Sequence, residues 1–331
     1  METPLDVVGV GNALVDVISF EDDAFVEAHS LEKGSMALVD AATGHRLYEA
    51  MGATTEASGG SAANTLAGVA SLGGRGGFIG RVRDDQLGDV FAHDIAAVGV
   101  EFPVPPATSG SPTGRSLIVV TPDGERTMST LLGAAGELTA DDVDEALVAR
   151  ASITYLEGYL FDQAAAGEAF AKAAAAAHRG GNRVALTLSD SFCVERYVDA
   201  FRRLVRETVD VLFGNEDELR LLFDGVTADE AVAAAERDCD LVVCTLGSKG
   251  AFVSGGGRRV RVPAEAVDRV VDTTGAGDLF AAGFLRGLTS GRDLEACSRL
   301  GAFAAAECIS HPGARPEHPL AALARRRGLQ G

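Results

Sequence analysis

Short apolar runs alternate with amphipathic stretches along most of this chain. Runs of mainly aliphatic and β-branched residues, which predict buried strands, occur at 6–10, 77–81, 152–156, 183–188, 209–213 and 241–245. Apolar residues at a 3.6-residue spacing predict helices at 41–51, 62–72, 86–98, 142–150, 163–179, 194–206, 228–237 and 294–308. Strands that alternate with helices in this way are typical of β-α units around a mostly parallel sheet. The pattern therefore predicts an α/β fold.

Four expected strands lie outside this alternation, at 13–20, 34–40, 114–120 and 125–130. The last two flank Thr121-Pro122-Asp123-Gly124, whose residues favour a tight turn between antiparallel strands. We interpret the four as a small separate sheet that forms a lid over a site. The chain, 1–331, is then a single domain, in which segments of about 13–40 and 103–131 make the lid and the rest makes a large α/β core.

The composition narrows the class of partner and the compartment. A net charge of −19 disfavours nucleic acids and anionic membrane surfaces, whose phosphate groups the protein repels at long range, but it does not exclude ATP. The five cysteines are scattered without C-x-x-C spacing, which indicates buried free thiols in a reducing compartment. No uninterrupted apolar run reaches 18 residues and no signal peptide is visible, so we expect a cytoplasmic protein.

The most informative stretch is 270–288, in which a short β-branched run meets the turn DTTGAG and a helical pattern begins at Asp278. Gly275 and Gly277 carry no Cβ atom, and the free N–H groups of a helix start concentrate partial positive charge, so residues Gly275, Ala276 and Gly277 are suited to bind phosphate. Asp278 could then take a proton from a hydroxyl while the amides stabilise a phosphoryl group in transfer. An Asp cap behind a glycine turn explains the same residues, and this stretch alone leaves the two interpretations even.

A second glycine-rich stretch changes that balance. GGSAANTLAGVASLG, at 59–73, is followed by GFIGRVRDDQLGDVF at 77–91, and together they resemble the first signature of the PfkB carbohydrate kinases, the ribokinase-like family. DTTGAGDLFAAGF, at 272–284, resembles the second signature, and the two occur in the expected order. The resemblance covers almost the whole chain. It implies a ribokinase-like three-layer α-β-α sandwich with a mostly parallel central sheet and a small β-sheet lid.

The resemblance also implies a set of residues that bind the acceptor substrate. In this family an Asp at the place of Asp16 holds sugar hydroxyls; from the residues alone, Asp16 is equally an exposed residue on an edge strand. Asn64 can donate to and accept from a hydroxyl, or it can cap a helix. Glu157 follows a predicted strand, near where sheets of this kind bind ligands. The full expected set is Asn12, Asp16, Gly59, Gly60, Ser61, Asn64 and Glu157.

A further set is expected at the nucleotide. Asn215 and Glu218 match the N-x-x-E motif of the family, in which the Glu organises Mg²⁺ through water; an acidic helix start is the alternative explanation. No P-loop is present, but Thr245-Leu246-Gly247-Ser248-Lys249-Gly250 resembles the T-L-G-x-x-G segment that borders the nucleotide, and it is also a plausible strand-to-hairpin turn. We therefore expect Asn215, Thr245, Gly247, Gly250 and Gly277 to contact ATP.

Two expectations rest on the family alone. Arg126 follows the turn of the predicted hairpin, and an Arg in a comparable lid hairpin of adenosine kinases favours contact with the transferring phosphate over a solvated strand position. The loop at 309–316 could close an adenine pocket or, with Asp272 and Thr274, offer carbonyls to a potassium ion. His311 in that loop is expected to be structural.

The predicted activity is transfer of the γ-phosphate of ATP to the primary hydroxyl of an adenosine-like nucleoside, with Mg²⁺. GNALVDV, TPDGERTMSTLLGAA and ISHPGARPE resemble bacterial adenosine-kinase-like members more than ribokinase. A free sugar such as ribose, fructose or 2-keto-3-deoxygluconate is the alternative acceptor. Two other classes of protein agree less well with the sequence. A nicotinamide oxidoreductase is suggested by Gly9-x-Gly11, but its fingerprint needs Gly at position 14, where this chain has Leu14. The other class is a non-catalytic nucleoside-binding protein. The sequence leaves monomer and homodimer open.

Overall fold

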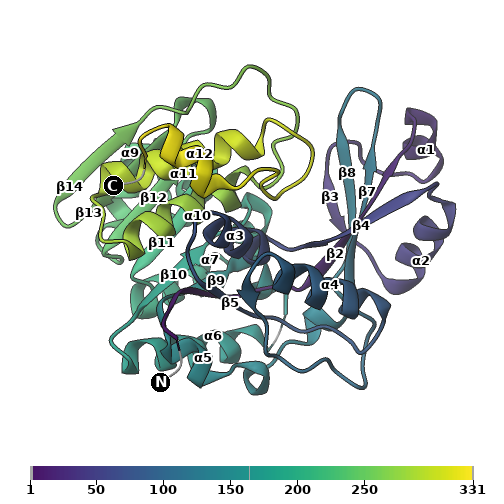
Figure 1. Cartoon of the computed structure of the whole chain (residues 1–331), viewed down its shortest axis with the longest axis horizontal. Helices are drawn as coiled ribbons and strands as arrows, with labels where there is room; N and C mark the ends of the chain where they lie inside the picture. Colours follow the sequence, from purple (N-terminus) through teal and green to yellow (C-terminus); the bar gives the residue numbers. More distant parts are fainter. Residues whose placement is uncertain (1–2, 164, 330–331) are drawn as a thin grey trace.

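The computed structural model describes residues 3–163 and 165–329, and it contains two β-sheets (Figure 1). The larger sheet has nine strands, in the order β14 (Arg258–Val262), β13 (Ala251–Gly255), β12 (Leu241–Thr245), β11 (Val211–Asn215), β10 (Arg183–Thr187), β9 (Ala151–Glu157), β1 (Leu5–Val10), β5 (Gly76–Ile79) and β6 (Val100–Glu101). All neighbouring strands are parallel except β12–β13 and β13–β14. The predicted α/β fold with a mostly parallel central sheet is confirmed.

Helices cover both faces of this sheet, because consecutive side chains of its buried strands point to opposite sides. In β1, Val7 packs into one core cluster and Val8 into the other, and neither is exposed to solvent. The first cluster includes α3 (Ser61–Ser71), α4 (Gln86–Ala97), α10 (Ala276–Thr289), α11 (Leu294–Cys308) and α12 (Leu320–Arg326). The second includes α5 (Glu145–Ala149), α6 (Ala166–Arg179), α7 (Ser191–Thr208), α8 (Glu216–Phe223) and α9 (Ala228–Ala235).

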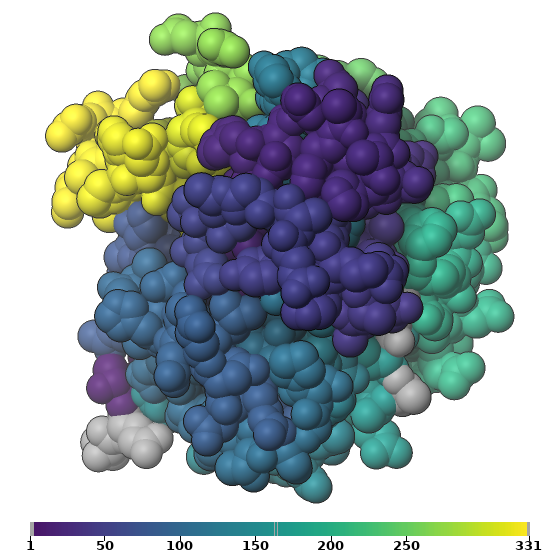
Figure 2. All heavy atoms as spheres, turned by 90° about the vertical axis from the view of Figure 1, so that its right-hand side faces the viewer, coloured from purple at the N-terminus to yellow at the C-terminus, as the bar shows by residue number. Residues whose placement is uncertain are grey.

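The smaller sheet stands at one end of the molecule, and Figure 2 looks onto it from outside. Its order is β3 (Met36–Leu38), β8 (Arg126–Leu131), β7 (Gly114–Val120), β2 (Leu14–Phe20) and β4 (Thr54–Gly59), with α1 (Asp23–Ala28) and α2 (Ala41–Ala50) beside it. The four strands expected outside the β-α units do pair in one sheet. β4 was not predicted, since its sequence TTEASG lacks the apolar alternation that marks a strand.

Several boundaries differ from the predicted ones for identifiable reasons. The helix predicted at 142–150 is shorter than expected: Thr139 and Asp142 form a capping box at a 3-10 turn, and α5 begins later, after its own cap Asp144. α6 begins at Ala166, within the predicted helix 163–179, of which residue 164 lies outside the described residues. α12 was not predicted. All five cysteines are buried free thiols, as expected. Among the described residues, no helix is both long and apolar enough to cross a membrane.

Candidate active site

A cavity of about 290 Å³ lies between the carboxyl end of the central sheet and the inner face of the small sheet. β1 and β9 run parallel in register, Val10 beside Leu156, so the residues that follow them meet at one edge of the sheet. Of the residues predicted at the acceptor and the anion hole, the lining includes Asn12, Asp16, Gly60, Ser61, Asn64, Glu157, Gly275, Ala276, Gly277 and Asp278. Segments more than 200 residues apart in sequence thus share one cavity.

Asp278 lies in the first turn of α10, beside the N-terminus of α3. Its Oδ1 accepts a hydrogen bond from Ser61 Oγ at 2.6 Å, and its Oδ2 accepts one from Asn64 Nδ2 at 3.3 Å. Burial raises the pKa of the carboxyl to about 6, against the opposing effect of these two donors and of Arg315. A carboxylate held in this way is still ionised at neutral pH and is a better proton acceptor than an exposed Asp.

The turn ahead of Asp278 requires glycine at its first position. Gly275 caps α10 with φ +77°, a left-handed conformation, and no side chain caps this helix start. A Cβ on Gly275 would lie 2.6 Å from the carbonyl oxygen of Ala314, so the loop after α11 packs directly against the turn. Gly277 has open space where its Cβ would be. The backbone of this turn is therefore accessible from the cavity and fixed from behind.

The first glycine stretch has an equally specific structural basis. Gly60, the cap of α3, has φ +94°, and a Cβ there would lie 2.2 Å from the carbonyl oxygen of Asn12. A Cβ on Gly59 would lie 2.4 Å from Oδ1 of Asp16. Gly59 does not line the cavity, but its lack of a side chain makes room for the Asp16 carboxylate. These glycines bring α3 against the β1–β2 connection.

Asp16 is on β2, an inner strand of the small sheet, so the alternative of an edge strand is wrong. The side chain is half-buried and lines the cavity. Burial raises its pKa to about 6, while the positive charges of Arg126 and Arg315 lower it and Asp278 raises it further. Asp16 and Asp278 are thus two interacting carboxylates at one cavity.

Glu157 is buried at the end of β9, where its carboxylate connects Asn12 to the first turn of α3. Its Oε1 accepts from the Nδ2 of Asn12 at 2.7 Å, and its Oε2 accepts from the backbone N–H of Ala62 at 2.8 Å. Gln163 donates in turn to Oδ1 of Asn12 at 2.9 Å. Burial raises the pKa of Glu157 to about 7. In this arrangement Glu157 orients Asn12 and the start of α3.

Arg126 is not a solvated strand residue, and it does not line this cavity. Its guanidinium pairs with Asp272, and both side chains are nearly buried. Asp272 also accepts from the backbone N–H of Thr274 at 2.9 Å and of Gly313 at 2.8 Å. Both carboxylate oxygens therefore already accept from nitrogen donors, one of them positively charged. These donors hold the Asp272 carboxylate in place, and potassium ligation by backbone carbonyls at Asp272 and Thr274 stays a prediction.

Of the residues predicted for the nucleotide, Gly277 lines the cavity, whereas Asn215, Thr245, Gly247 and Gly250 lie outside it, along the same edge of the sheet. Asn215 ends β11 and is in parallel register with Thr245, the last residue of β12. Asn215 and Glu218 form a reciprocal cap of α8: Asn215 Nδ2 donates to Glu218 Oε1 at 2.6 Å, and Glu218 N donates to Asn215 Oδ1 at 2.9 Å. The alternative of an acidic helix start is thus realised, and burial raises the pKa of Glu218 to about 7.

Gly247 and Gly250 differ in what their lack of a side chain permits. A Cβ on Gly250, at φ +95°, would lie 2.0 Å from the carbonyl oxygen of Val262, so glycine is needed there for the hairpin itself. Gly247 has no heavy atom within 4 Å of its Cβ position, so its backbone is open to a ligand. The hairpin explanation therefore applies at Gly250, and the contact of this segment with a nucleotide stays a prediction that the open backbone at Gly247 permits.

Two kinds of residue at the site were not predicted from the sequence. The small sheet presents apolar side chains to the cavity, from Leu14, Met36, Leu38, Ile118 and Met128, and Leu132 directly follows β8. Their alternation along strands was visible, but not which face would meet the core. Arg315, in the loop after α11, contacts Asn64 and Ser58, and neither periodicity nor motif spacing marks it.

A carboxylate beside a helix N-terminus, in a cavity lined by hydroxyl-binding groups, defines a site suited to phosphoryl transfer. The model of the pfkB family carbohydrate kinases matches residues 36–320, and the chain belongs to this family of sugar and nucleoside kinases. The chain is similar to an adenosine kinase from Sinorhizobium meliloti (50% identity, 98% of this chain and 100% of that one, TM-score 0.92). It is also similar to a probable sugar kinase from Rhizobium etli CFN 42 (47% identity, 99% and 100%, TM-score 0.93). Adenosine kinase of Saccharomyces cerevisiae is 29% identical over 96% of this chain and 98% of its own length.

Proposed function

We propose that this protein transfers the γ-phosphoryl group of ATP to the primary hydroxyl of an adenosine-like nucleoside. The observation that carries the proposal is the mixed lining of the cavity. Its polar groups suit a sugar and a phosphate: Asn12, Asp16, Asn64, Asp278 and the turn at Gly275. Its large apolar side chains come mainly from the small sheet, which also contributes Asp16, Ser116 and Thr130.

The apolar side chains of this lining support a nucleobase as part of the substrate. Met36 and Leu38 on β3 are 36% and 46% exposed although they face the cavity, and Ile118 and Met128 lie beside them. Exposed large apolar side chains grouped at a cavity favour an apolar or aromatic ligand group. A free sugar would leave these side chains in water, whereas a planar base would cover them.

In the proposed reaction, Asp278 accepts the proton of the primary hydroxyl as that oxygen attacks the γ-phosphorus. The new bond joins the hydroxyl oxygen to phosphorus, the bond between phosphorus and the bridging oxygen of ADP breaks, and ADP leaves with the electron pair. Backbone N–H groups at the start of α10 stabilise the charge on the phosphoryl oxygens, since no side chain caps that helix. Asp16 and Asn64 hold the neighbouring hydroxyls, and Ser61 and Asn64 orient Asp278.

ATP would lie along the edge formed by Asn215, Thr245 and Gly247, with its γ-phosphate at Gly275–Gly277. Among the described residues no group of three or more His, Cys, Asp or Glu side chains could hold a metal ion. This fits Mg²⁺, which in kinases is bound largely by phosphate oxygens and water, with one or two carboxylates. Glu218 would contribute through water, and the ion would neutralise charge on the phosphates. No step of the proposal depends on potassium.

A free sugar remains the second candidate, because the polar groups of the cavity would by themselves bind one. The similarity to the probable sugar kinase of Rhizobium etli also supports it. A panel that measures ADP release with adenosine, other nucleosides, ribose, fructose and 2-keto-3-deoxygluconate separates the two. Adenosine should give the highest kcat/KM. Turnover of a sugar alone would favour the second candidate, and binding of adenosine without ADP release would indicate a binding protein.

A further inference from the structure

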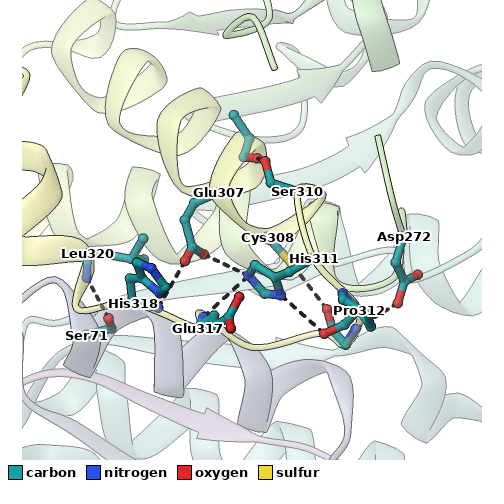
Figure 3. Close-up of polar contacts among 12 residues, drawn as sticks. Ser71, Asp272, Glu307, Cys308, Ser310, His311, Pro312, Glu317, His318 and Leu320 are labelled. Carbon is teal, nitrogen blue, oxygen red and sulfur yellow. Dashed lines mark hydrogen bonds and ion pairs between the residues drawn. The ribbon is translucent and has the colours of Figure 1, made fainter. Parts of the chain in front are cut away.

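The loop after α11 is held from several sides. Glu307 accepts from the backbone N–H of His318 at 3.1 Å and lies 3.3 Å from Nε2 of His311 (Figure 3). Cys308 and Asp272 bind the two backbone polar groups of Gly313, and Leu320 donates its N–H to Ser71 at 2.9 Å. These contacts lie on both sides of Arg315 along the chain. The loop therefore presents the Arg315 side chain in one place.

Arg315 extends from this loop to α3 and β4. Its Nε donates to Oδ1 of Asn64 at 3.0 Å, and its Nη1 donates to Oγ of Ser58. Its Nη2 is buried and has no hydrogen-bond partner among the described residues. Burial lowers the pKa of Arg315 to about 10, opposed by the negative charges of Asp16, Asp94 and Asp278. Burial of a guanidinium costs desolvation free energy, which an apolar side chain holding the loop in place would not cost.

The contact with Asn64 determines which way that amide faces. Because Oδ1 of Asn64 accepts from Arg315, the Nδ2 group is left to donate to Asp278 Oδ2. The reversed amide would place an NH₂ group against the guanidinium and an oxygen against the carboxylate, and both contacts would be repulsive. Arg315 therefore selects the Asn64 orientation that supports Asp278.

The second effect of Arg315 is electrostatic. It is a positive charge close to both Asp16 and Asp278, and it favours the ionised form of each. Other titratable groups that interact with Asp278 are Tyr155, Glu157, Tyr159 and Cys308, and Asp16 also interacts with Arg126. Arg315 is the positive charge that lowers the pKa of Asp278. Without it, two carboxylates would share the cavity with less compensation.

We propose that Arg315 is a positioning residue of the acceptor site, which fixes the Asn64 amide and keeps Asp16 and Asp278 ionised together. This inference rests on the proposed phosphoryl transfer at Asp278. Arg315 acts through Asn64 and through its charge, and it does not touch the reacting atoms. A purely structural arginine would affect the stability of the loop but not the ionisation of the site.

The test compares Arg315→Gln and Arg315→Lys with a control, Arg327→Gln. Arg327 lies on the same C-terminal segment as Arg315, but its side chain is exposed and pairs with Glu265. Steady-state ADP release is measured against pH. Arg315→Gln should raise the KM for the acceptor by about 10- to 100-fold, the usual effect of a lost charged hydrogen bond. It should move the acidic limb of kcat/KM upward by roughly 0.5–1 pH unit. The KM for ATP should stay within about twofold, and Arg327→Gln should change neither value.

Arg315→Lys separates the two effects, because it keeps the charge but loses the fixed Nε donor. Its acidic limb should stay near that of the wild type, while its acceptor KM should rise. If Arg315→Gln does not fold, Arg315→Lys carries the test. An unchanged acceptor KM and limb in the folded variants, with only a lower Tm, would overturn the proposal.

Two further measurements test whether Arg315 acts through Asn64 and whether its role is independent of turnover. In an Asn64→Ala background, the substitution at Arg315 should raise the acceptor KM much less than in the wild type, since the intermediary is gone. Equal effects in both backgrounds would contradict action through Asn64. If the wild type releases no ADP with any acceptor, the proposed function fails by itself. Calorimetric binding of adenosine to the wild type and to Arg315→Gln then tests the role of Arg315, and equal affinities would refute it.

Discussion

The guanidinium of Arg126 pairs with the carboxylate of Asp272 across 146 positions of the sequence. The two side chains are 10% and 7% exposed, so the pair is nearly buried. Arg126 belongs to β8 of the small sheet, and Asp272 lies three residues before the glycine that caps α10. The pair therefore connects the sheet that covers the cavity with the turn that would bind the phosphate.

Removal of one partner of this pair should destabilise the fold. Asp272→Asn leaves a nearly buried guanidinium without its counter-charge, at a cost of up to about 3–5 kcal/mol in the free energy of unfolding. The double variant Asp272→Asn/Arg126→Gln should recover part of that loss. Urea unfolding measures both. Glu295→Gln, which breaks the exposed pair with Arg299, should cost only about 0.2–1 kcal/mol. Equal losses in the free energy of unfolding for Asp272→Asn and Glu295→Gln would show that the buried pair stabilises the fold no more than an exposed one.

Asp278→Asn should remove the general base without removing the cavity. We expect kcat to fall by about 100- to 10,000-fold, while the affinity for ATP stays close to that of the wild type. ADP release and nucleotide calorimetry measure the two quantities. Asp268→Asn, at an exposed position, is the matched control and should retain full activity. Near-full activity of Asp278→Asn would eliminate the assigned role.

The same carboxyl should leave a signature in the pH dependence of activity and stability. Its pKa is about 6 in the folded protein and 3.8 in the unfolded chain. The base must be ionised, so kcat/KM should fall below about pH 6. The raised pKa contributes stability that is fully present below the unfolded value and is lost as pH rises through 6. The Tm of Asp278→Asn relative to the wild type should therefore increase between about pH 4.5 and pH 7.5. A constant difference would contradict the raised pKa.

A comparison of Gly60 with Gly73 separates the stability cost of a left-handed backbone conformation from the cost of a steric clash. Both have positive φ, +94° and +79°, but only a Cβ on Gly60 would meet another atom, the carbonyl oxygen of Asn12. Gly73→Ala should cost about 1–2 kcal/mol for its left-handed conformation. Gly60→Ala should cost more and should also raise the acceptor KM, because it displaces Asn12. Thermal unfolding and ADP release measure these effects, and equal losses of stability would refute the steric argument.

The apolar side chains that line the cavity should matter for a nucleoside and not for a sugar. Leu38→Gln should raise the KM for adenosine by about tenfold, equivalent to roughly 1.4 kcal/mol of lost apolar contact. The KM of any accepted free sugar should not change. Phe20→Gln is the control, since Phe20 is 75% exposed on the same sheet but outside this cavity. A similar effect of both variants on adenosine would argue against a base at Leu38.

Much of the local structure followed from the order of residues alone. The 3.6-residue pattern after Asp278, the glycine turn before it and the β-α alternation are local properties, so they predicted α10, its cap and the parallel sheet. The four expected strands of the small sheet were likewise visible. β4 was not, because TTEASG becomes a strand only by pairing with β2, whose sequence lies about 40 positions earlier.

The sequence by itself determined most of the elements, the two glycine turns and the kinase family, because each depends on neighbouring residues or on long contiguous motifs. Only the tertiary structure decided that Arg126 meets Asp272, that Asn215 and Glu218 cap one another, and that Arg315 faces Asn64. Such contacts join residues through the packing of separate elements, or select one of several partners that a polar side chain could take. No periodicity along the chain encodes that choice.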